Sequence, residues 1–243
     1  MPGDIPVGVR VDTHAAGQPQ RQTLDGTFAK LVPLQASHTH DLYKHLCDGS
    51  KPTNFTYLGV GPFENEDSFA QHIANIAPSQ DPFYFTVITK QALGNGGIGE
   101  EEVPPDSAVG YISLLNIDRA HRTVEIGWVT FSPRLQRTTV ATETLYLLMA
   151  YCMDGLGNRR LEWKCDALNA PSRRAAERLG FAYEGTFRKH RIVRGRNRDT
   201  TWFSIVDNEW SARRRALLAW LAPENFEEGR QVRTLDAIRK GME

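Results

Sequence analysis

The polar run QRTT (residues 136–139) separates two apolar segments and could bind an anion. The segment before it is rich in β-branched residues and predicts a strand, whereas the one after it predicts a helix. The run therefore lies at a helix N-terminus, where unpaired N–H groups and the positive end of the helix dipole attract anions. We interpret it as a candidate phosphate site. The alternative is that its threonines only cap the helix.

A candidate proton acceptor, Glu125, lies in the strand-like segment RTVEIGWV (residues 122–129). Strand alternation puts Glu125 on the same face as Gly127 and Val129. We therefore expect its carboxylate to be partly desolvated, as the carboxylates of general bases often are. The alternative is an exposed strand glutamate that pairs with Arg122 or another cation.

Ser172 is a candidate hydrogen-bond donor to a leaving group. It lies in the segment NAPSRRAAERLGF, which predicts a helix with Asn169 as its N-cap, Pro171 in its first turn and Gly180 just past its end. Helical spacing places Ser172 on an apolar, inward face, where its hydroxyl needs a partner. The alternative is a first-turn serine that bonds to its own backbone.

The rest of the pattern predicts the elements that position these groups. One strand–helix–strand crossover spans residues 122–165 and should make its two strands parallel, whereas the other connections are hairpins. This predicts an α/β fold, a single domain with a mixed, mostly antiparallel sheet and flanking helices. Ligands of α/β sheets bind beyond the carboxyl ends of parallel strands, where the QRTT run lies. We expect strands over residues 27–34, 83–89, 109–116, 122–131, 161–165, 181–187 and 199–206, and helices over residues 38–47, 66–77, about 140–153, 169–179 and 208–221.

Length and composition indicate one globular domain with extensions. The chain has 243 residues, of which 40% are hydrophobic and 24% charged. We expect a flexible N-terminal arm (residues 1–25), a domain (26–210) and a C-terminal helix with a charged tail (211–243). The 29 basic and 29 acidic residues balance, which argues against a nucleic-acid partner. Few cysteines, a polar start and no apolar run of ~18 residues predict a cytoplasmic protein without a membrane segment.

Two segments together resemble the GCN5-related N-acetyltransferase (GNAT) superfamily. Its phosphate loop has the form Gln/Arg-x-x-Gly-x-Gly/Ala, which is similar to QRTTVA at residues 136–141. Its block of Asn-x-x-Ser followed by Gly-Phe is similar to residues 169–181. The segments VEIGWVTF and ATETL most resemble the branch of ribosomal-protein alanine N-acetyltransferases. One departure is Thr139, which adds bulk and a hydroxyl donor where the family usually has glycine.

The resemblance implies an enzyme that transfers the acetyl group of acetyl-CoA by direct attack of a primary amine, either a protein N-terminus or a small molecule. It assigns Glu125 to draw a proton from the amine and Ser172 to support the leaving sulfur. Ala176 stands where many members carry a tyrosine acid. The implied coenzyme-binding residues are Val129, Thr130, Phe131, Gln136, Arg137, Thr138, Thr139, Val140, Ala141, Thr142, Asn169 and Ser172. The aromatic candidates for an acceptor pocket are Phe55, Tyr57, Trp128 and Trp202.

Other interpretations stay open beside this one. A non-catalytic CoA-binding sensor or scaffold is the alternative function, because Thr139 replaces glycine and the tyrosine acid is absent. The basic stretch RKHRIVRGRNRD (residues 188–199) predicts a hairpin with solvated arginines that could face an acidic substrate, and it lacks aromatics to stack on bases. His38, His40 and His45 lack accompanying cysteine or acidic ligands, so we expect surface histidines and no metal. We expect a monomer or a homodimer.

Overall fold

Eight strands form one sheet in the computed structural model, which describes residues 5–47, 52–94 and 102–242. The order across the sheet is β1-β2-β3-β4-β5-β6-β8-β7, and every neighbouring pair is antiparallel except β5 and β6. The predicted α/β class, with a mixed and mostly antiparallel sheet, is therefore confirmed. The strands are β1 (Leu24–Asp25), β2 (Ala29–Pro33), β3 (Phe83–Thr89), β4 (Ala108–Asp118), β5 (Thr123–Phe131), β6 (Arg160–Asp166), β7 (Ala182–Val193) and β8 (Arg196–Val206).

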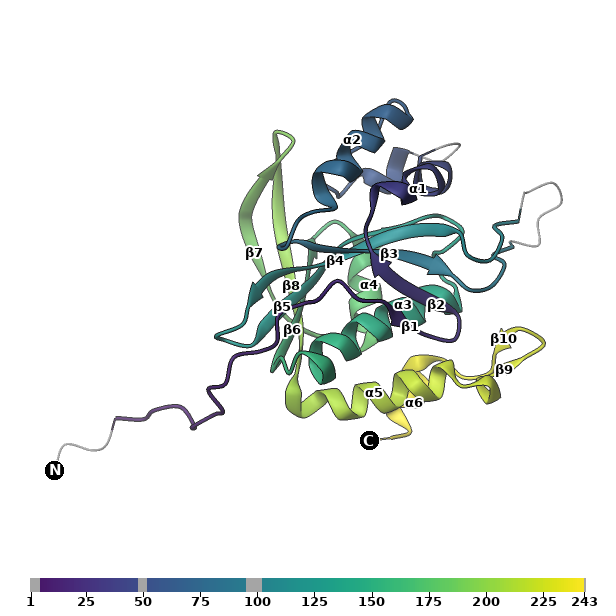
Figure 1. The fold of residues 1–243 in the computed structure, drawn as a ribbon. Helices are drawn as coiled ribbons and strands as arrows, with labels where there is room; N and C mark the ends of the chain where they lie inside the picture. The colour runs from purple at the N-terminus through teal and green to yellow at the C-terminus, as the bar shows by residue number, and fades with distance from the viewer. Residues whose placement is uncertain (1–4, 48–51, 95–101, 243) are drawn as a thin grey trace.

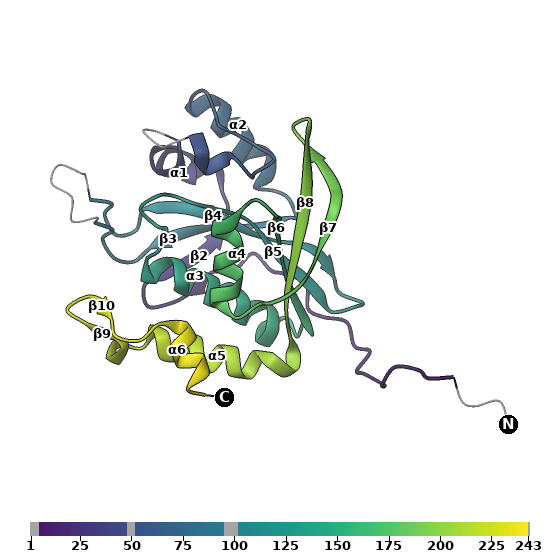
Figure 2. The same cartoon turned by 180° about the vertical axis from the view of Figure 1, so that it is seen from behind.

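Helices cover both faces of this sheet (Figures 1 and 2). On one face lie α1 (Thr39–Leu46) and α2 (Glu66–Ile76). The other face carries α3 (Thr139–Ala150), α4 (Ala170–Leu179), α5 (Asp207–Leu221) and α6 (Leu235–Lys240). Short turns complete the chain: Ala36–His38, Pro52–Phe55, the π-helical Tyr151–Gly155, Pro223–Asn225, and the small hairpin of β9 (Phe226–Glu227) and β10 (Arg230–Gln231).

Strand β3 shows why two layers of helices are needed. All seven of its residues are buried, because the strand is central and covered on both faces. Phe83 and Phe85 belong to the core under α3 to α6. Tyr84 and Ile88 belong to the second core, under α1 and α2. This explains why the sequence FYFTVIT is rich in aromatic and β-branched residues and does not alternate between apolar and polar ones.

The two parallel strands of the crossover separate partway along their length. Pairing between β5 and β6 runs from Thr123–Arg160 to Ile126–Trp163 and then stops. Beyond this point residues 127–131 of β5 pair only with β4. A bulge interrupts that pairing, and Trp128 adopts the left-handed conformation with a φ of 48°. The sheet therefore opens on the β6 side of β5, next to α3.

The basic stretch 188–199 forms a hairpin as predicted, but the strands β7 and β8 are longer than the predicted ones. The predicted strands ended at residue 187 and began again at residue 199, whereas the paired strands continue to Val193 and from Arg196. Arg194 and Gly195 form the turn, both with positive φ, as two-residue hairpin turns require. The hairpin projects from the sheet towards α2 (Figures 1 and 2). There the guanidinium of Arg194 donates to the carbonyl of Gly61.

The N-terminal and the C-terminal extension both contact the domain. The domain limits expected from the sequence, residues 26–210, stay a prediction. The N–H of Ala16 donates to the carbonyl of Arg119 (2.9 Å), and Arg21 donates to the carbonyl of Ala77 (2.6 Å). In the C-terminal segment, Leu235 and Ile238 of α6 are buried against the main core. Among the described residues, no helix combines the length and apolar character needed to cross a bilayer.

Candidate active site

A cleft lies where β5 and β6 separate. Its walls come from β4, β5 and β6, the start of α4, the β7–β8 hairpin, and residues 57–59 of the loop before α2. Glu125, Lys164 and Ser172 line it together. Tyr57 closes one side, because its hydroxyl donates to the carbonyl of Leu168 (3.0 Å). The fold thus brings six separate parts of the chain around one space.

Glu125 is buried in the wall of this cleft, with 5% of its surface exposed. One carboxylate oxygen, Oε2, accepts from Nζ of Lys164 (2.7 Å) and from Nδ2 of Asn116 (2.6 Å). The other, Oε1, has no hydrogen-bond partner among the described residues. A Cβ atom at Gly127 would lie 3.7 Å from Oε1. The carboxylate is therefore anchored by one oxygen, while the other remains available to a ligand.

Lys164, which the sequence analysis missed, links Glu125 to a chain of ion pairs. Its ammonium contacts Oε2 of Glu162 at 2.8 Å, and Glu162 pairs with Arg160 at 2.7 Å. Arg160 in turn makes two hydrogen bonds to Glu184. Burial would raise the pKa of Glu162, but the hydrogen bonds from Lys164 and Arg160 outweigh it and lower that pKa.

The alternation of RLEWKCD in β6 could have revealed this charged row. Leu161, Trp163 and Cys165 are buried, so the charged residues between them share the opposite face. The parallel register sets Glu125 opposite Glu162, which brings Lys164 within reach of both carboxylates. Of the alternative, an exposed glutamate paired with a cation, the pairing is present with Lys164 as the cation, but the expected exposure was wrong because Glu125 is buried.

Ser172 lies across the cleft in the first turn of α4. Asn169 caps this helix, because its Oδ1 accepts from the N–H of Ser172 (3.1 Å). The hydroxyl of Ser172 accepts from the indole N–H of Trp163 (3.0 Å). Burial raises the pKa of the neighbouring Cys165 thiol, and a hydrogen bond with Ser172 partly offsets that effect. Since an indole N–H only donates, Ser172 keeps its own proton to donate.

The QRTT run forms the N-terminus of α3. Thr138 is the N-cap: its hydroxyl accepts from the N–H of Ala141 (3.1 Å) and donates to the carbonyl of Leu135 (2.7 Å). The capping alternative therefore holds for this threonine. Helix geometry leaves the N–H groups of Thr139 and Val140 without an intrahelical acceptor. Thr139 is partly exposed, whereas Val140 is fully buried, so the N–H of Thr139, and not the Thr138 hydroxyl, is the donor at this helix start that an anion can reach.

The other expected coenzyme-binding residues surround this helix start. Gln136 donates to the carbonyl of Phe131 (3.0 Å), and the exposed Arg137 has a φ of 65°. Thr142 accepts from the guanidinium of Arg178 in α4 at 3.2 Å. Val129 lines the cleft, and Thr130 is buried beside it in β5. The expected residues of β5 and the QRTT run thus lie along one edge of β5 and at the start of α3, whereas Asn169 and Ser172 lie in α4, and only Val129, Asn169 and Ser172 of the expected set line the cleft.

The four aromatic candidates separate into two groups. Tyr57 and Trp128 line the cleft. Phe55 does not: it is 2% exposed and packs in the second core, with its ring 5.7 Å from that of Phe63. Trp202 also lies outside the lining, where its ring covers the ammonium of Lys164 at 4.0 Å.

The three early histidines differ in exposure. His40 is exposed, whereas His38 and His45 are partly buried. Burial lowers the pKa of His38, and its Nδ1 contacts the hydroxyl of Thr86 at 2.8 Å. Within the described part of the chain, no group of three or more His, Cys, Asp or Glu side chains is arranged to hold a metal ion.

Comparison with known proteins assigns this arrangement to a family. A family model described as "Acetyltransferase (GNAT) domain" matches residues 30–182. A crystal structure of a GCN5-related N-acetyltransferase from Brucella melitensis is 39% identical to this chain, with a TM-score of 0.86, and the match covers 93% of this chain and 98% of that one. The chain therefore belongs to the GNAT acetyltransferase family, and the resemblance noted from the sequence is confirmed.

Two further similarities extend this assignment. The putative ribosomal N-acetyltransferase YdaF of Bacillus subtilis (strain 168) is 29% identical over 136 residues, which cover 54% of this chain and 73% of YdaF. The self-immunity acetyltransferase MccE, solved in complex with acetyl-CoA and AMP, is 20% identical with a TM-score of 0.60 over 74% of this chain and 93% of that one. At this level of identity the second similarity concerns the fold.

Proposed function

We propose that this protein is an acetyl-CoA-dependent N-acetyltransferase that acetylates a primary amine by direct attack. The observation that carries the proposal is the carboxylate of Glu125. It is buried in the cleft, held through Oε2 by Lys164 and Asn116, and free to bind a ligand through Oε1. A fixed, water-poor carboxylate within reach of a ligand suits proton transfer.

The residues present fit acetyl-CoA. The free edge of β5 at residues 129–131 offers backbone groups to an extended chain such as pantetheine, and the partly exposed N-terminus of α3 at Thr139 suits a pyrophosphate. Arg137 adds an exposed positive charge beside them. When bound, acetyl-CoA supplies an activated acetyl thioester. MccE, which shares the fold, was solved with acetyl-CoA bound, in keeping with this fit.

Glu125 and Ser172 divide the proton movements between them. An amine must lose a proton as it forms its bond to the acetyl carbon, and Oε1 of Glu125 accepts that proton, directly or through one water. Ser172 is oriented by the indole of Trp163, so its hydroxyl proton can be donated towards the departing sulfur. Ala176 carries no acidic group, which leaves this role to Ser172.

The names of relatives indicate the class of acceptor amine only in general terms. YdaF is named a putative ribosomal N-acetyltransferase, so a protein N-terminus is one candidate acceptor. The cleft also opens to small amines beside Tyr57 and Trp128. The non-catalytic sensor predicts acetyl-CoA binding without thiol release from any amine, which the following experiment separates from catalysis.

Acetyl-CoA binding and thiol release over a panel of amines and N-terminal peptides test the proposal. Glu125→Gln keeps an acceptor for Asn116 but loses the proton-accepting oxygen, so we expect kcat to fall by roughly 10²–10⁴. Ser172→Ala should lower kcat by roughly tenfold. Both variants should bind acetyl-CoA within about twofold of the wild type, because neither change removes a donor to the phosphates.

Glu184→Gln is the matched control. It loosens the far end of the same chain of ion pairs, outside the cleft, and should leave kcat unchanged. Equal turnover in wild type and Glu125→Gln would contradict the assigned role of Glu125. Tight binding of acetyl-CoA without thiol release on the whole panel would favour the sensor.

A further inference from the structure

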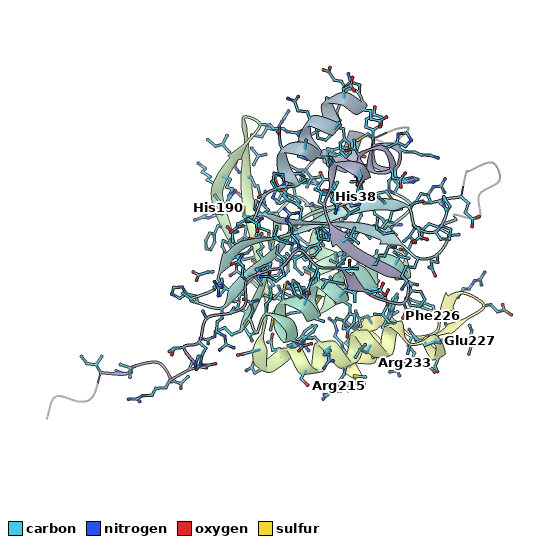
Figure 3. The ribbon with its side chains drawn as sticks, viewed as in Figure 1. His38, His190, Arg215, Phe226, Glu227 and Arg233 are labelled. Atoms are coloured by element: carbon cyan, nitrogen blue, oxygen red, sulfur yellow. The ribbon has the colours of Figure 1, made fainter. Side chains whose placement is uncertain are left out.

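The projecting β7–β8 hairpin contributes a second cluster of polar side chains to the cleft. His190 and Arg191 of β7 and Arg198 and Thr200 of β8 line it, opposite Tyr57 and near Asp166. Figure 3 labels His190 on this hairpin. The residues belong to the basic stretch 188–199 and its continuation, which the assigned chemistry of Glu125 and Ser172 does not use.

The strand register places two positive charges directly opposite each other. Arg191 pairs with Arg198 across β7 and β8, and like charges in this position destabilise a hairpin. No carboxylate among the described residues forms an ion pair with either guanidinium. A bulge before Arg191 turns the strand, and the N–H of Lys189 donates there to Asp199 (2.7 Å). Because of the bulge, the consecutive residues His190 and Arg191 both line the cleft.

Several polar atoms of this hairpin are buried without partners. They are Nδ1 of His190, Nε of Arg198, Oγ1 of Thr200 and Nε1 of Trp202, and none has a hydrogen-bond partner among the described residues. Each such atom in a folded protein is destabilising. By contrast, Oε2 of Glu125, Lys164 and Ser172 all have partners within the protein. His190, Arg198 and Thr200 line the cleft, whereas Trp202 does not, so three of these unpaired polar atoms and the unpaired positive charge gather at one end of the cleft.

We propose that this end of the cleft binds an oxyanion, a carboxylate or a phosphate, carried by the acceptor amine. This inference rests on the proposed N-acetyltransferase function and names the class of its acceptor. Arg191 and Arg198 neutralise the oxyanion, and the imidazole of His190 and the hydroxyl of Thr200 complete its hydrogen bonds. Thr139, at the helix start proposed for the coenzyme phosphates, lies outside this lining.

Matched amines test the proposal by their kcat/KM. The panel is butylamine, 4-aminobutyrate, 2-aminoethyl phosphate and 1,4-diaminobutane, with one neutral and one basic N-terminal peptide. We expect at least one anionic amine to exceed butylamine by roughly 10² in kcat/KM, as a charged pair of hydrogen bonds allows. Arg198→Gln should lower the ratio of kcat/KM for the anionic amine to kcat/KM for butylamine by at least roughly tenfold. The exposed Arg196, outside the lining, provides the control Arg196→Gln.

A second measurement does not depend on turnover. Inorganic phosphate and acetate are titrated into the wild type and Arg198→Gln in the presence of acetyl-CoA. The proposed anion site is supported if phosphate or acetate binds at least fivefold more weakly to Arg198→Gln than to the wild type. The anion that binds then shows whether the acceptor amine carries a phosphate or a carboxylate. Equal anion binding in both proteins would overturn the proposed anion site, and so would a higher kcat/KM for butylamine or the basic peptide than for the anionic amines. Anion binding without thiol release from any amine would instead overturn the proposed function and leave the anion site standing.

Discussion

The carboxylate of Glu143 fixes α3 to the first hairpin of the sheet. Only 5% of this residue is exposed, and its two oxygens accept from the N–H groups of Thr27 (2.9 Å), Phe28 (2.6 Å) and Ala29 (2.7 Å). Gly26 completes the fit, because a Cβ there would lie 2.6 Å from the carboxylate. One side chain thus accepts hydrogen bonds from the backbone N–H groups of three consecutive residues.

Truncation by Glu143→Ala leaves these three donors without their acceptor. A buried donor that loses its partner costs about 1–3 kcal/mol. The N–H of Ala29 is fully buried, whereas water can reach the other two more easily. We therefore expect the free energy of unfolding to fall by about 3–5 kcal/mol, which is large for one substitution. Glu143→Gln keeps one acceptor oxygen and should lose about half as much.

Urea unfolding followed by circular dichroism measures this loss. The midpoint should fall while the slope stays unchanged, since the surface exposed on unfolding is the same. Glu177→Ala, at an exposed position of α4, is the control and should change stability by less than about 0.5 kcal/mol. A loss below about 1 kcal/mol for Glu143→Ala would refute the reasoning, because the three donors would then find other partners.

Two further predictions concern the coenzyme and pH. Thr139→Gly should lower the Kd of acetyl-CoA severalfold in calorimetry, because glycine lets phosphates approach the backbone; a higher Kd would show that the hydroxyl is itself a donor. The pKa of Glu162 is lowered on folding, so its contribution to stability is present above about pH 4.5 and is lost as the pH falls through the folded pKa. Glu162→Gln should therefore be less stable than the wild type at about pH 6, and the difference should shrink as the pH falls below about 4.5; a constant difference would contradict the linkage.

Local patterns predicted most elements of the fold. The range predicted for β3 agrees with Phe83–Thr89, and the expected N-cap Asn169 and the terminal Gly180 bound α4 as predicted. These signals depend on neighbouring residues only. The hairpin over residues 188–199 was predicted, but the extent of its strands was not, because their alternate positions are charged on both faces and give no apolar period.

The sequence alone was enough to indicate the class of fold, the parallel crossover, the helix start at residues 138–139 and the candidates Glu125 and Ser172. The tertiary structure decided what surrounds them. It paired Glu125 with Lys164, 39 residues away, buried Phe55 in a core, and turned Arg191 and Arg198 into the same cleft. The physical reason is strand register: periodicity sets which face a residue takes, whereas the pairing of distant strands sets its neighbours.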